Sequence, residues 1–172
     1  KIYCGTSKDR VSIELRPEVV NKRLRIGDWE VDSVVGRMHQ SALVTLVERS
    51  SRYTSIIKVN SKEAGVVADA IIKRANELEL PLHTITGDTG TEFSNHKTIA
   101  EQLGIDFYFT HPYSSWEKGT NENTNGLIRQ YFPKRTDFNS ISEDMINLVE
   151  NKLNNRPRKC LNFKRPSDFL KV

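Results

Sequence analysis

Three stretches rich in β-branched residues, separated by very short turns, constrain the fold of this chain more than any other feature. They cover residues 28–35, 41–49 and 52–59, and their composition is typical of strands. Residues 36–40 and 50–51 form the connections between them. Because connections this short join antiparallel neighbours, the pattern predicts a three-stranded antiparallel meander.

The rest of the chain alternates between helical and strand patterns. The order β-β-β-α-β-α-β-α-α predicts an α/β fold in which two parallel strands adjoin the meander to give one five-stranded mixed sheet flanked by helices. The predicted elements after the meander are a helix from its N-cap Ser61 to before Pro81, a strand at 82–87, a helix from Thr91 or Ser94 to Gly104, a strand at 105–110, a helix from Trp116 to about Tyr131 and a helix at about 142–154.

The helix that follows Pro112, with Ser114 or Ser115 as its cap, has two distinct faces. The face expected to pack inward consists of Thr120, Thr124, Leu127 and Tyr131. The second face consists of Lys118, Glu122, Asn125 or Gly126, and Arg129. A carboxylate between basic residues suits a site that holds a metal ion next to a phosphodiester, although an exposed ladder of ion pairs has the same spacing. On the last helix the residues expected on one side are Met145, Leu148, Val149 and Leu153.

Positive charge gathers in three clusters, although the formal net charge is only +4. The clusters lie at residues 22–25, at 129–135 and near the C-terminus, where they include Arg156, Arg158 and Lys159. Clusters of this kind are typical of nucleic-acid binding, while solubility and short ion pairs explain any single one of them. No apolar run approaches the roughly 20 residues that a membrane span needs.

Cysteine and histidine usage argues against a zinc module. The four histidines and the two cysteines, Cys4 and Cys160, show no zinc-ligand spacing. One disulfide between the cysteines is conceivable, but unpaired thiols in a reducing cytoplasm are the expected state.

The length of 172 residues suits one domain. Residues 1–24 lack periodicity and contain Pro17, so they are predicted to form an extended arm or a linker from a missing N-terminal DNA-binding domain. Residues 25–172 form the predicted core with its basic C-terminal tail. The first residue is Lys and not Met, as expected for a fragment of a longer protein.

Three acidic residues stand where the predicted sheet brings them together. Asp32 lies in the first strand, Asp88 follows the fourth strand, and Glu122 lies on the helix after the fifth. Strand ends in mixed α/β sheets are common sites, and a few carboxylates suffice for Mg²⁺. Periodicity alone leaves the choice open, because other acids lie close to these three in the sequence. The competitors are Asp28, Glu30, Glu92 and Glu117.

The chain resembles the catalytic core of the IS30-family bacterial transposases, within the wider class that includes retroviral integrases. The resemblance covers nearly the whole chain from about residue 10, and 33 residues separate Asp88 from Glu122, as in the family. The matching motifs are G-D-W-E-V-D at 27–32, A-L-V-T-L-V-E-R at 42–49, D-T-G-T-E-F at 88–93, H-P-Y-S-S-W-E-K-G-T-N-E-N-T-N-G-L-I-R-Q-Y-F-P-K at 111–134 and L-N-N-R-P-R-K-C-L at 153–161.

This resemblance implies an RNase H-like fold in which Asp32, Asp88 and Glu122 bind two Mg²⁺ or Mn²⁺ ions. It implies a DDE transposase, a polynucleotidyl transferase that cleaves double-stranded DNA at transposon ends with water and then joins the freed 3′-hydroxyl to target DNA. Both steps are phosphoryl transfers. It also implies action in the bacterial cytoplasm at the nucleoid, as a dimer or larger homo-oligomer. The residues expected to contact DNA are Lys118, Asn123, Asn125 and Arg129, with Arg156, Arg158 and Lys159 from the C-terminal basic cluster.

One position departs from the family pattern. The family commonly has D-N-G after the second strand acid, whereas this chain has Asp88-Thr89-Gly90, which replaces an amide with a hydroxyl. The change removes no metal ligand, so it bears on rate and local geometry. Two alternatives stay open: a nuclease of the same fold that cleaves without joining, and a DNA-binding or assembly module with a silent site.

Overall fold

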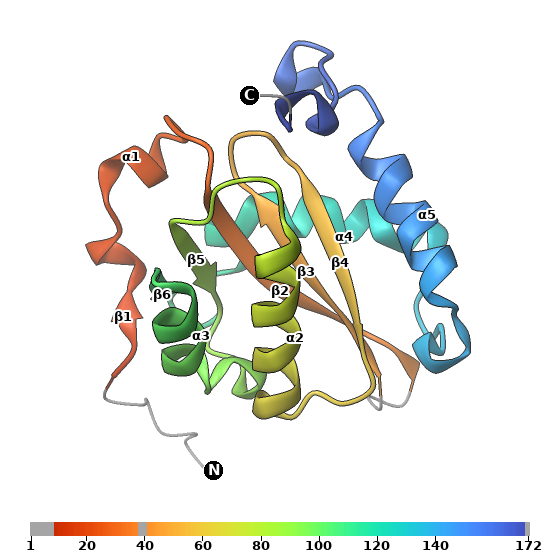
Figure 1. Ribbon diagram of the computed structural model, residues 1–172, viewed down its shortest axis with the longest axis horizontal. Helices are drawn as coiled ribbons and strands as arrows, with labels where there is room; N and C mark the ends of the chain where they lie inside the picture. The colour runs from red at the N-terminus through yellow and green to blue at the C-terminus, as the bar shows by residue number, and fades with distance from the viewer. Residues whose placement is uncertain (1–8, 38–40, 171–172) are drawn as a thin grey trace.

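The computed structural model describes residues 9–37 and 41–170, and a six-stranded mixed sheet forms its centre (Figure 1). Strands β2, β3 and β4 form the predicted antiparallel meander, and β5, β6 and β1 continue the sheet parallel to β2. The order across the sheet is β1 (Val11–Ser12), β6 (Asp106–Phe109), β5 (Thr84–Gly87), β2 (Asp28–Val35), β3 (Ala42–Glu48) and β4 (Thr54–Val59). The α/β mixed-sheet prediction is confirmed.

The sixth strand comes from the segment that was predicted to be an extended arm. Val11 and Ser12 pair in parallel with Tyr108 and Phe109, which adds an edge strand to the five that were predicted. In the short helix α1 (Glu18–Asn21), which follows, Val20 is completely buried and its carbonyl accepts from Arg49 at 3.3 Å. Residues 9–24 are therefore part of the folded body, whereas their role as a link to an upstream DNA-binding domain stays a prediction.

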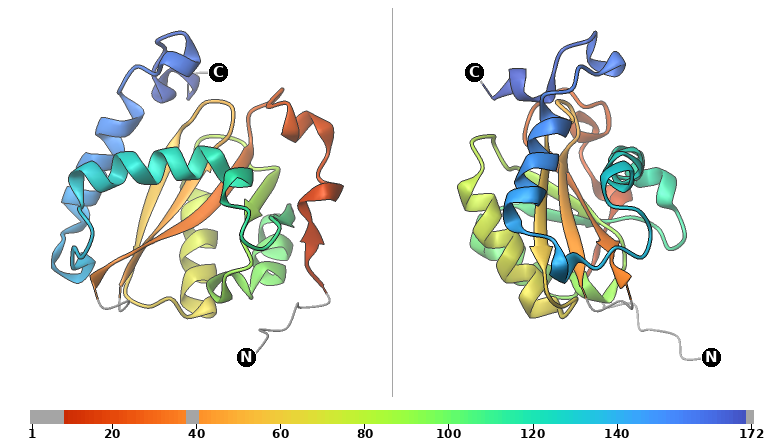
Figure 2. Two further views of the ribbon diagram at one scale, coloured as in Figure 1. Left: turned by 180° about the vertical axis from the view of Figure 1, so that it is seen from behind. Right: turned by 90° about the vertical axis from the view of Figure 1, so that its right-hand side faces the viewer.

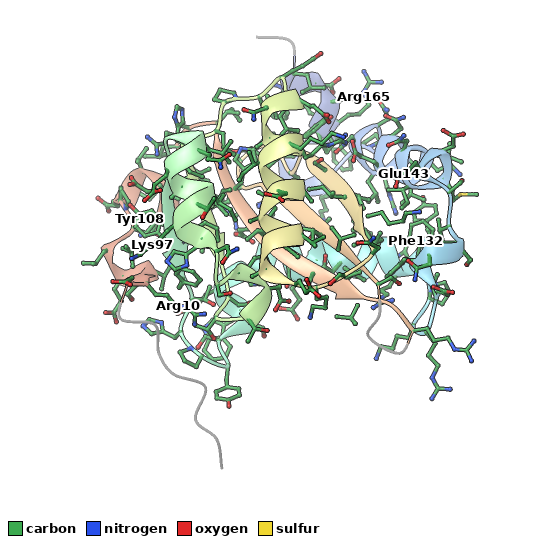
Figure 3. The ribbon with its side chains drawn as sticks, turned by 60° about the horizontal axis from the view of Figure 1, so that its bottom comes forward. Arg10, Lys97, Tyr108, Phe132, Glu143 and Arg165 are labelled. Carbon is green, nitrogen blue, oxygen red and sulfur yellow. The ribbon has the colours of Figure 1, made fainter. Side chains whose placement is uncertain are left out.

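The N-terminal segment also contacts the body through charged side chains. Asp9 forms an ion pair at 2.8 Å with Lys97, which is labelled in Figure 3. The neighbouring Arg10 stacks over the Phe109 ring, 4.9 Å from its centroid, and donates to the Thr89 carbonyl at 3.2 Å. The segment thus reaches the loop that follows β5.

Helices cover both faces of the sheet (Figure 2). Helices α2 (Ala64–Glu77) and α3 (His96–Leu103) pack on one face around a core that includes Trp29 and Val31. Helices α4 (Gly119–Tyr131) and α5 (Glu143–Asn154) enclose a second core that includes Val34. Since successive strand residues point to opposite faces, β2 sends Trp29 and Val31 toward α2 and α3, and Val34 toward α4. The 3-10 turns are Ile13–Leu15, Thr91–Phe93, Ser115–Lys118, Phe138–Ser140, Lys159–Leu161 and Pro166–Phe169.

Several helix starts and faces differ from the sequence prediction. Helix α2 begins at Ala64 and not at Ser61, whose hydroxyl accepts a hydrogen bond from the Glu63 amide outside the helix. The helix after Pro112 begins as a 3-10 turn, and neither Ser114 nor Ser115 caps it. Helix α5 begins as predicted, after Ser142, whose hydroxyl caps it by accepting from the Met145 amide.

The buried faces of α4 and α5 are each rotated from the predicted ones. On α4 the buried residues are Thr120, Asn121, Thr124 and Ile128, while Tyr131 is exposed. On α5 they are Ile146, Val149, Glu150, Leu153 and Asn154, whereas Met145 and Leu148 are about half exposed. The rotation of α5 has a polar cause, because this helix turns Glu150 and Asn154 toward the edge strand β4. Glu150 accepts from the Ile56 amide, and Asn154 accepts from the Thr54 amide and donates to the Thr54 carbonyl.

The basic C-terminal tail folds back on the body as far as residue 170. Pro166 is buried, and the Ser167 hydroxyl donates to the Asn155 side chain at the end of α5. Cys160 is an exposed free thiol, and Cys4 lies outside the described residues. No helix within residues 9–37 and 41–170 has the length and apolar character to cross a membrane.

Candidate active site

The register of two parallel strands places Asp32 and Asp88 side by side. Asp28 pairs with Thr84 and Glu30 with Thr86, so the same register, continued by two residues, brings Asp88 next to Asp32. The side chains alternate along each strand, and both acids therefore point to the face of the sheet that α4 covers. Two carboxylates from distant parts of the chain meet in this way.

The ammonium group of Lys118 lies between the two carboxylates. Its Nζ is 3.2 Å from Asp32 Oδ1 and 2.9 Å from Asp88 Oδ2, and it donates to the Val31 carbonyl at 3.3 Å. Only 4% of Lys118 is exposed, so the side chain predicted to contact DNA from a helix surface is enclosed by the site. The contact gives both acids a single cationic partner.

Helix α4 supplies the remaining polar groups. Asn125 Nδ2 donates to Asp32 Oδ2 at 2.9 Å, and this bond orients the carboxylate. Glu122 is exposed one turn before Asn125 and lines the same cleft as Asp32 and Asp88. The cleft has a volume of about 490 Å³, and its wall opposite α4 includes His111 and Tyr113. Within the described parts of the chain, no three His, Cys, Asp or Glu side chains converge tightly enough to hold a metal together.

The competing acids all have other partners. Asp28 pairs with Arg25 at 2.9 Å and accepts from the Thr84 hydroxyl. Glu92 accepts from the Ser33 hydroxyl at 2.7 Å and pairs with Lys62 at 3.0 Å. Neither carboxylate lines the cleft.

Glu30 and Glu117 form contacts that stabilise the structure around the site. Glu30 is fully buried, pairs with Arg49, and accepts from the Asn121 amide at 3.0 Å. That amide lies in the first turn of α4, where backbone donors have no partner within the helix, so Glu30 anchors the start of the helix that carries Glu122. Sequence reasoning missed this role, although the alternation in β2 had already placed Glu30 on the same side as Asp32. Glu117 pairs with His111.

The loop after β5 is shaped by close approaches. Asp88 Oδ1 accepts from the Gly90 amide at 2.8 Å. A Cβ at residue 90 would lie 2.5 Å from Glu92 Oε2 and 2.8 Å from Asp88 Oδ1, so a larger residue would displace these carboxylate groups. Thr89, which replaces the family's usual asparagine, lines the cleft and accepts the Arg10 hydrogen bond through its carbonyl.

His111 connects the cleft loop to two acids. Its Nδ1 lies 2.7 Å from Glu117 Oε1, and its Nε2 lies 3.3 Å from Glu14 Oε1. The hydrogen bond to Glu117, the charge of Glu117 and the weaker influence of Glu14 raise the pKa of His111 above its ordinary value. Protonation allows both ring nitrogens to donate at once.

The other predicted DNA contacts lie in different settings. Arg129 donates to the Val35 carbonyl at 2.8 Å and to the Pro133 carbonyl at 3.3 Å, and burial lowers its pKa. Arg158 is half-buried and donates to the Leu153 carbonyl. The exposed members of the predicted set are Asn123, Arg156 and Lys159.

The sheet order and the carboxylates at its centre define the RNase H-like class of catalytic domains. Solved structures that share this fold include an intasome of simian T-cell lymphotropic virus bound to the PP2A regulatory subunit B56 gamma, and the catalytic core domain of BIV integrase. The intasome chain superposes with a TM-score of 0.68 and covers 85% of this chain and 54% of its own length. The BIV integrase core superposes with a TM-score of 0.63 and covers 83% of this chain and 92% of its own length. Each is 18% identical to this chain. At this identity the likeness concerns the fold.

Residues 24–115 match the family described as integrase core domain, and the chain belongs to that family. The transposase for insertion sequence element IS4351 of Bacteroides fragilis is 46% identical over 97% of this chain and 51% of its own length. The transposase InsI for IS30A of Escherichia coli K12 is 41% identical over 92% of this chain and 41% of its own length. The chain spans about half the length of the curated relatives it matches, and the predicted resemblance to IS30-family transposases is confirmed.

Proposed function

We propose that this chain is the catalytic domain of a DDE transposase, which cleaves double-stranded DNA at transposon ends and joins the freed 3′-hydroxyl to target DNA. The observation that carries the proposal is the convergence of Asp32 and Asp88 on one cationic group, in a cleft that Glu122 also lines. The names of the relatives, which are transposases of insertion sequences, support the same activity.

The residues present fit a divalent metal site. Two carboxylates from adjacent strands already direct oxygens at one positive charge, and carboxylate oxygens are the ligands that Mg²⁺ and Mn²⁺ prefer. Asp32, Asp88 and Glu122 would hold two such ions, which supply activation of an oxygen nucleophile and neutralisation of phosphate charge.

The protein's own groups prepare this site before any ligand enters. Asn125 fixes the Asp32 carboxylate by a hydrogen bond, and the Gly90 amide fixes that of Asp88. Glu30 sets the position of α4, and hence of Glu122, through the Asn121 amide. Positioning of this kind supplies much of the catalysis in phosphoryl transfer.

Double-stranded DNA is the proposed partner, and the active assembly is proposed to be a homo-oligomer in the bacterial cytoplasm. Asn123 next to the cleft, together with Arg156 and Lys159 beyond α5, offers exposed polar and basic groups for phosphates. Arg129 and Arg158 already donate hydrogen bonds to backbone carbonyls, so fewer of their N–H groups are available to phosphates and their proposed contribution to DNA binding is smaller.

The test combines the protein with Mn²⁺, a pre-cut transposon end and a supercoiled plasmid. We expect joined products from the unaltered chain and none from Asp32→Asn, Asp88→Asn or Glu122→Gln, each with an unchanged fold by circular dichroism. Glu117→Gln is the matched control. Glu117 is also an acid near this helix, but its carboxylate pairs with His111. Full activity in any of the three variants would remove that residue from the catalytic set.

The same assay separates the two alternatives. Nicked plasmid without joined product identifies a nuclease that stops after hydrolysis. Calorimetry that detects no Mg²⁺ or Mn²⁺ binding sensitive to Glu122→Gln identifies a silent DNA-binding module.

A further inference from the structure

The Lys118 ammonium is placed where a cation between Asp32 and Asp88 has to be. It contacts one oxygen of each carboxylate, at 3.2 and 2.9 Å, and it is almost completely enclosed. The remaining oxygens are held by protein groups, since Asn125 donates to Asp32 Oδ2 and the Gly90 amide donates to Asp88 Oδ1. The oxygens that face Lys118 are Asp32 Oδ1, which also accepts from the Ser33 amide at 2.9 Å, and Asp88 Oδ2.

We propose that Lys118 is an internal counter-ion that competes with the first divalent cation for Asp32 and Asp88, so that metal binding releases its ammonium into the cleft. This inference rests on the proposed function, because it assumes that the two aspartates bind metal. It assigns Lys118 the role of balancing the charges of Asp32 and Asp88 before metal binds, which differs from a permanent contact with DNA.

Electrostatics supports competition over joint occupancy. Two carboxylates that contact the same ammonium group would repel each other without a cation between them, and Lys118 supplies that charge in the metal-free chain. A divalent ion needs the same oxygens and repels the ammonium at close range. The wall around Lys118 is protein, so water screens this repulsion weakly.

The backbone around Lys118 provides a route for the release. Lys118 lies at the junction between the 3-10 turn Ser115–Lys118 and helix α4, where it is the N-cap residue. Gly119 follows it, and a Cβ there would meet no other atom within 4 Å, so the space beside residue 119 is open. Once released from the two aspartates, the ammonium points into the cleft that Glu122 lines. A DNA phosphate would be the strongest hydrogen-bond acceptor there.

The first experiment measures Mn²⁺ affinity by electron paramagnetic resonance in the absence of DNA. We expect Lys118→Met to bind Mn²⁺ roughly tenfold more tightly than the unaltered chain or better, because the competing charge is gone. Lys58→Met is the control: it also removes one lysine charge, from a half-buried side chain that contacts the Ile141 carbonyl and Glu143 and does not line the cleft. Lys118→Gln provides a second variant in case the methionine variant fails to fold.

The outcomes distinguish this inference from the function on which it rests. Equal or weaker Mn²⁺ binding by a folded Lys118 variant overturns the competition. If the unaltered chain binds Mn²⁺ and Asp88→Asn abolishes that binding, the proposed function stays intact. Absence of Mn²⁺ binding in the unaltered chain and in the Lys118 variants overturns both. A tenfold gain in Lys58→Met as well would attribute the effect to net charge and overturn the specific role of Lys118.

A second measurement uses the unaltered chain and needs no substitution. Amine acetylation followed by mass spectrometry reports whether the Lys118 ammonium is accessible. We expect Lys118 to be protected without metal and to react several-fold faster at saturating Mg²⁺, while Lys58 reacts at the same rate in both states. Unchanged protection of Lys118 at saturating Mg²⁺ overturns the release.

Discussion

The buried ion pair between Glu30 and Arg49 gives the sharpest test of how the site is supported. The Glu30 side chain is fully buried and that of Arg49 is 5% exposed, so solvent screens their attraction very little. Glu30→Gln keeps an oxygen that can accept from the Asn121 amide but leaves the Arg49 guanidinium buried without its counter-charge. We expect this substitution to lower the free energy of unfolding by about 3–5 kcal/mol, the range typical of a broken buried pair.

The assay is guanidinium unfolding followed by tryptophan fluorescence, since Trp29 is completely buried next to Glu30 in β2. The double variant Glu30→Gln/Arg49→Met should recover part of the loss, because it also removes the unpaired charge. Glu18→Gln is the control: its ion pair with Lys22 is exposed, and the expected change is within about 0.5 kcal/mol. A loss below about 1 kcal/mol for Glu30→Gln would refute the reasoning that this ion pair is shielded from solvent.

Two further predictions concern the edge of the sheet and the cleft loop. Asn154→Leu leaves the Thr54 amide and carbonyl unpaired and should lower the free energy of unfolding by about 2 kcal/mol or more, whereas Asn151→Leu at an exposed position of the same helix should change it by less than about 0.5 kcal/mol; equal losses in chemical denaturation would contradict this. His111 has a raised pKa in the folded chain, so its stabilising contribution is fully present below its ordinary pKa of about 6.5 and disappears as the pH rises through the folded value. The difference in unfolding free energy between the unaltered chain and His111→Gln should therefore shrink with rising pH across this window, and a constant difference would exclude the ion pairs with Glu117 and Glu14 as its cause.

Local patterns were sufficient to predict the mixed sheet and to place several acids near one another, whereas the choice of Asp32, Asp88 and Glu122 among them came from the resemblance to the transposase family. Alternation along β2 puts Asp32 on one face, the position of Asp88 after β5 puts it at a strand end, and the helical spacing keeps Glu122 in line with Asn125. These are short-range properties of the backbone, so they can be read from neighbouring residues. The two-residue strand β1 was missed, because its pairing depends on β6, almost one hundred positions further along the chain, and its own sequence carries too little signal.

The sequence alone determined which side chains share a face, whereas only the tertiary structure decided which way each face turns and which charges meet. Helical periodicity grouped Lys118 with Glu122 and Arg129, yet the packing of α4 on β2 and β3 turned Lys118 inward to Asp32 and Asp88 and tied Arg129 to the Val35 carbonyl. Likewise, the apolar residues of α5 did not reveal that Glu150 and Asn154 would turn toward β4. The physical reason is that a buried charge or an unpaired backbone group must find a partner, and that partner is set by contacts between segments remote in sequence.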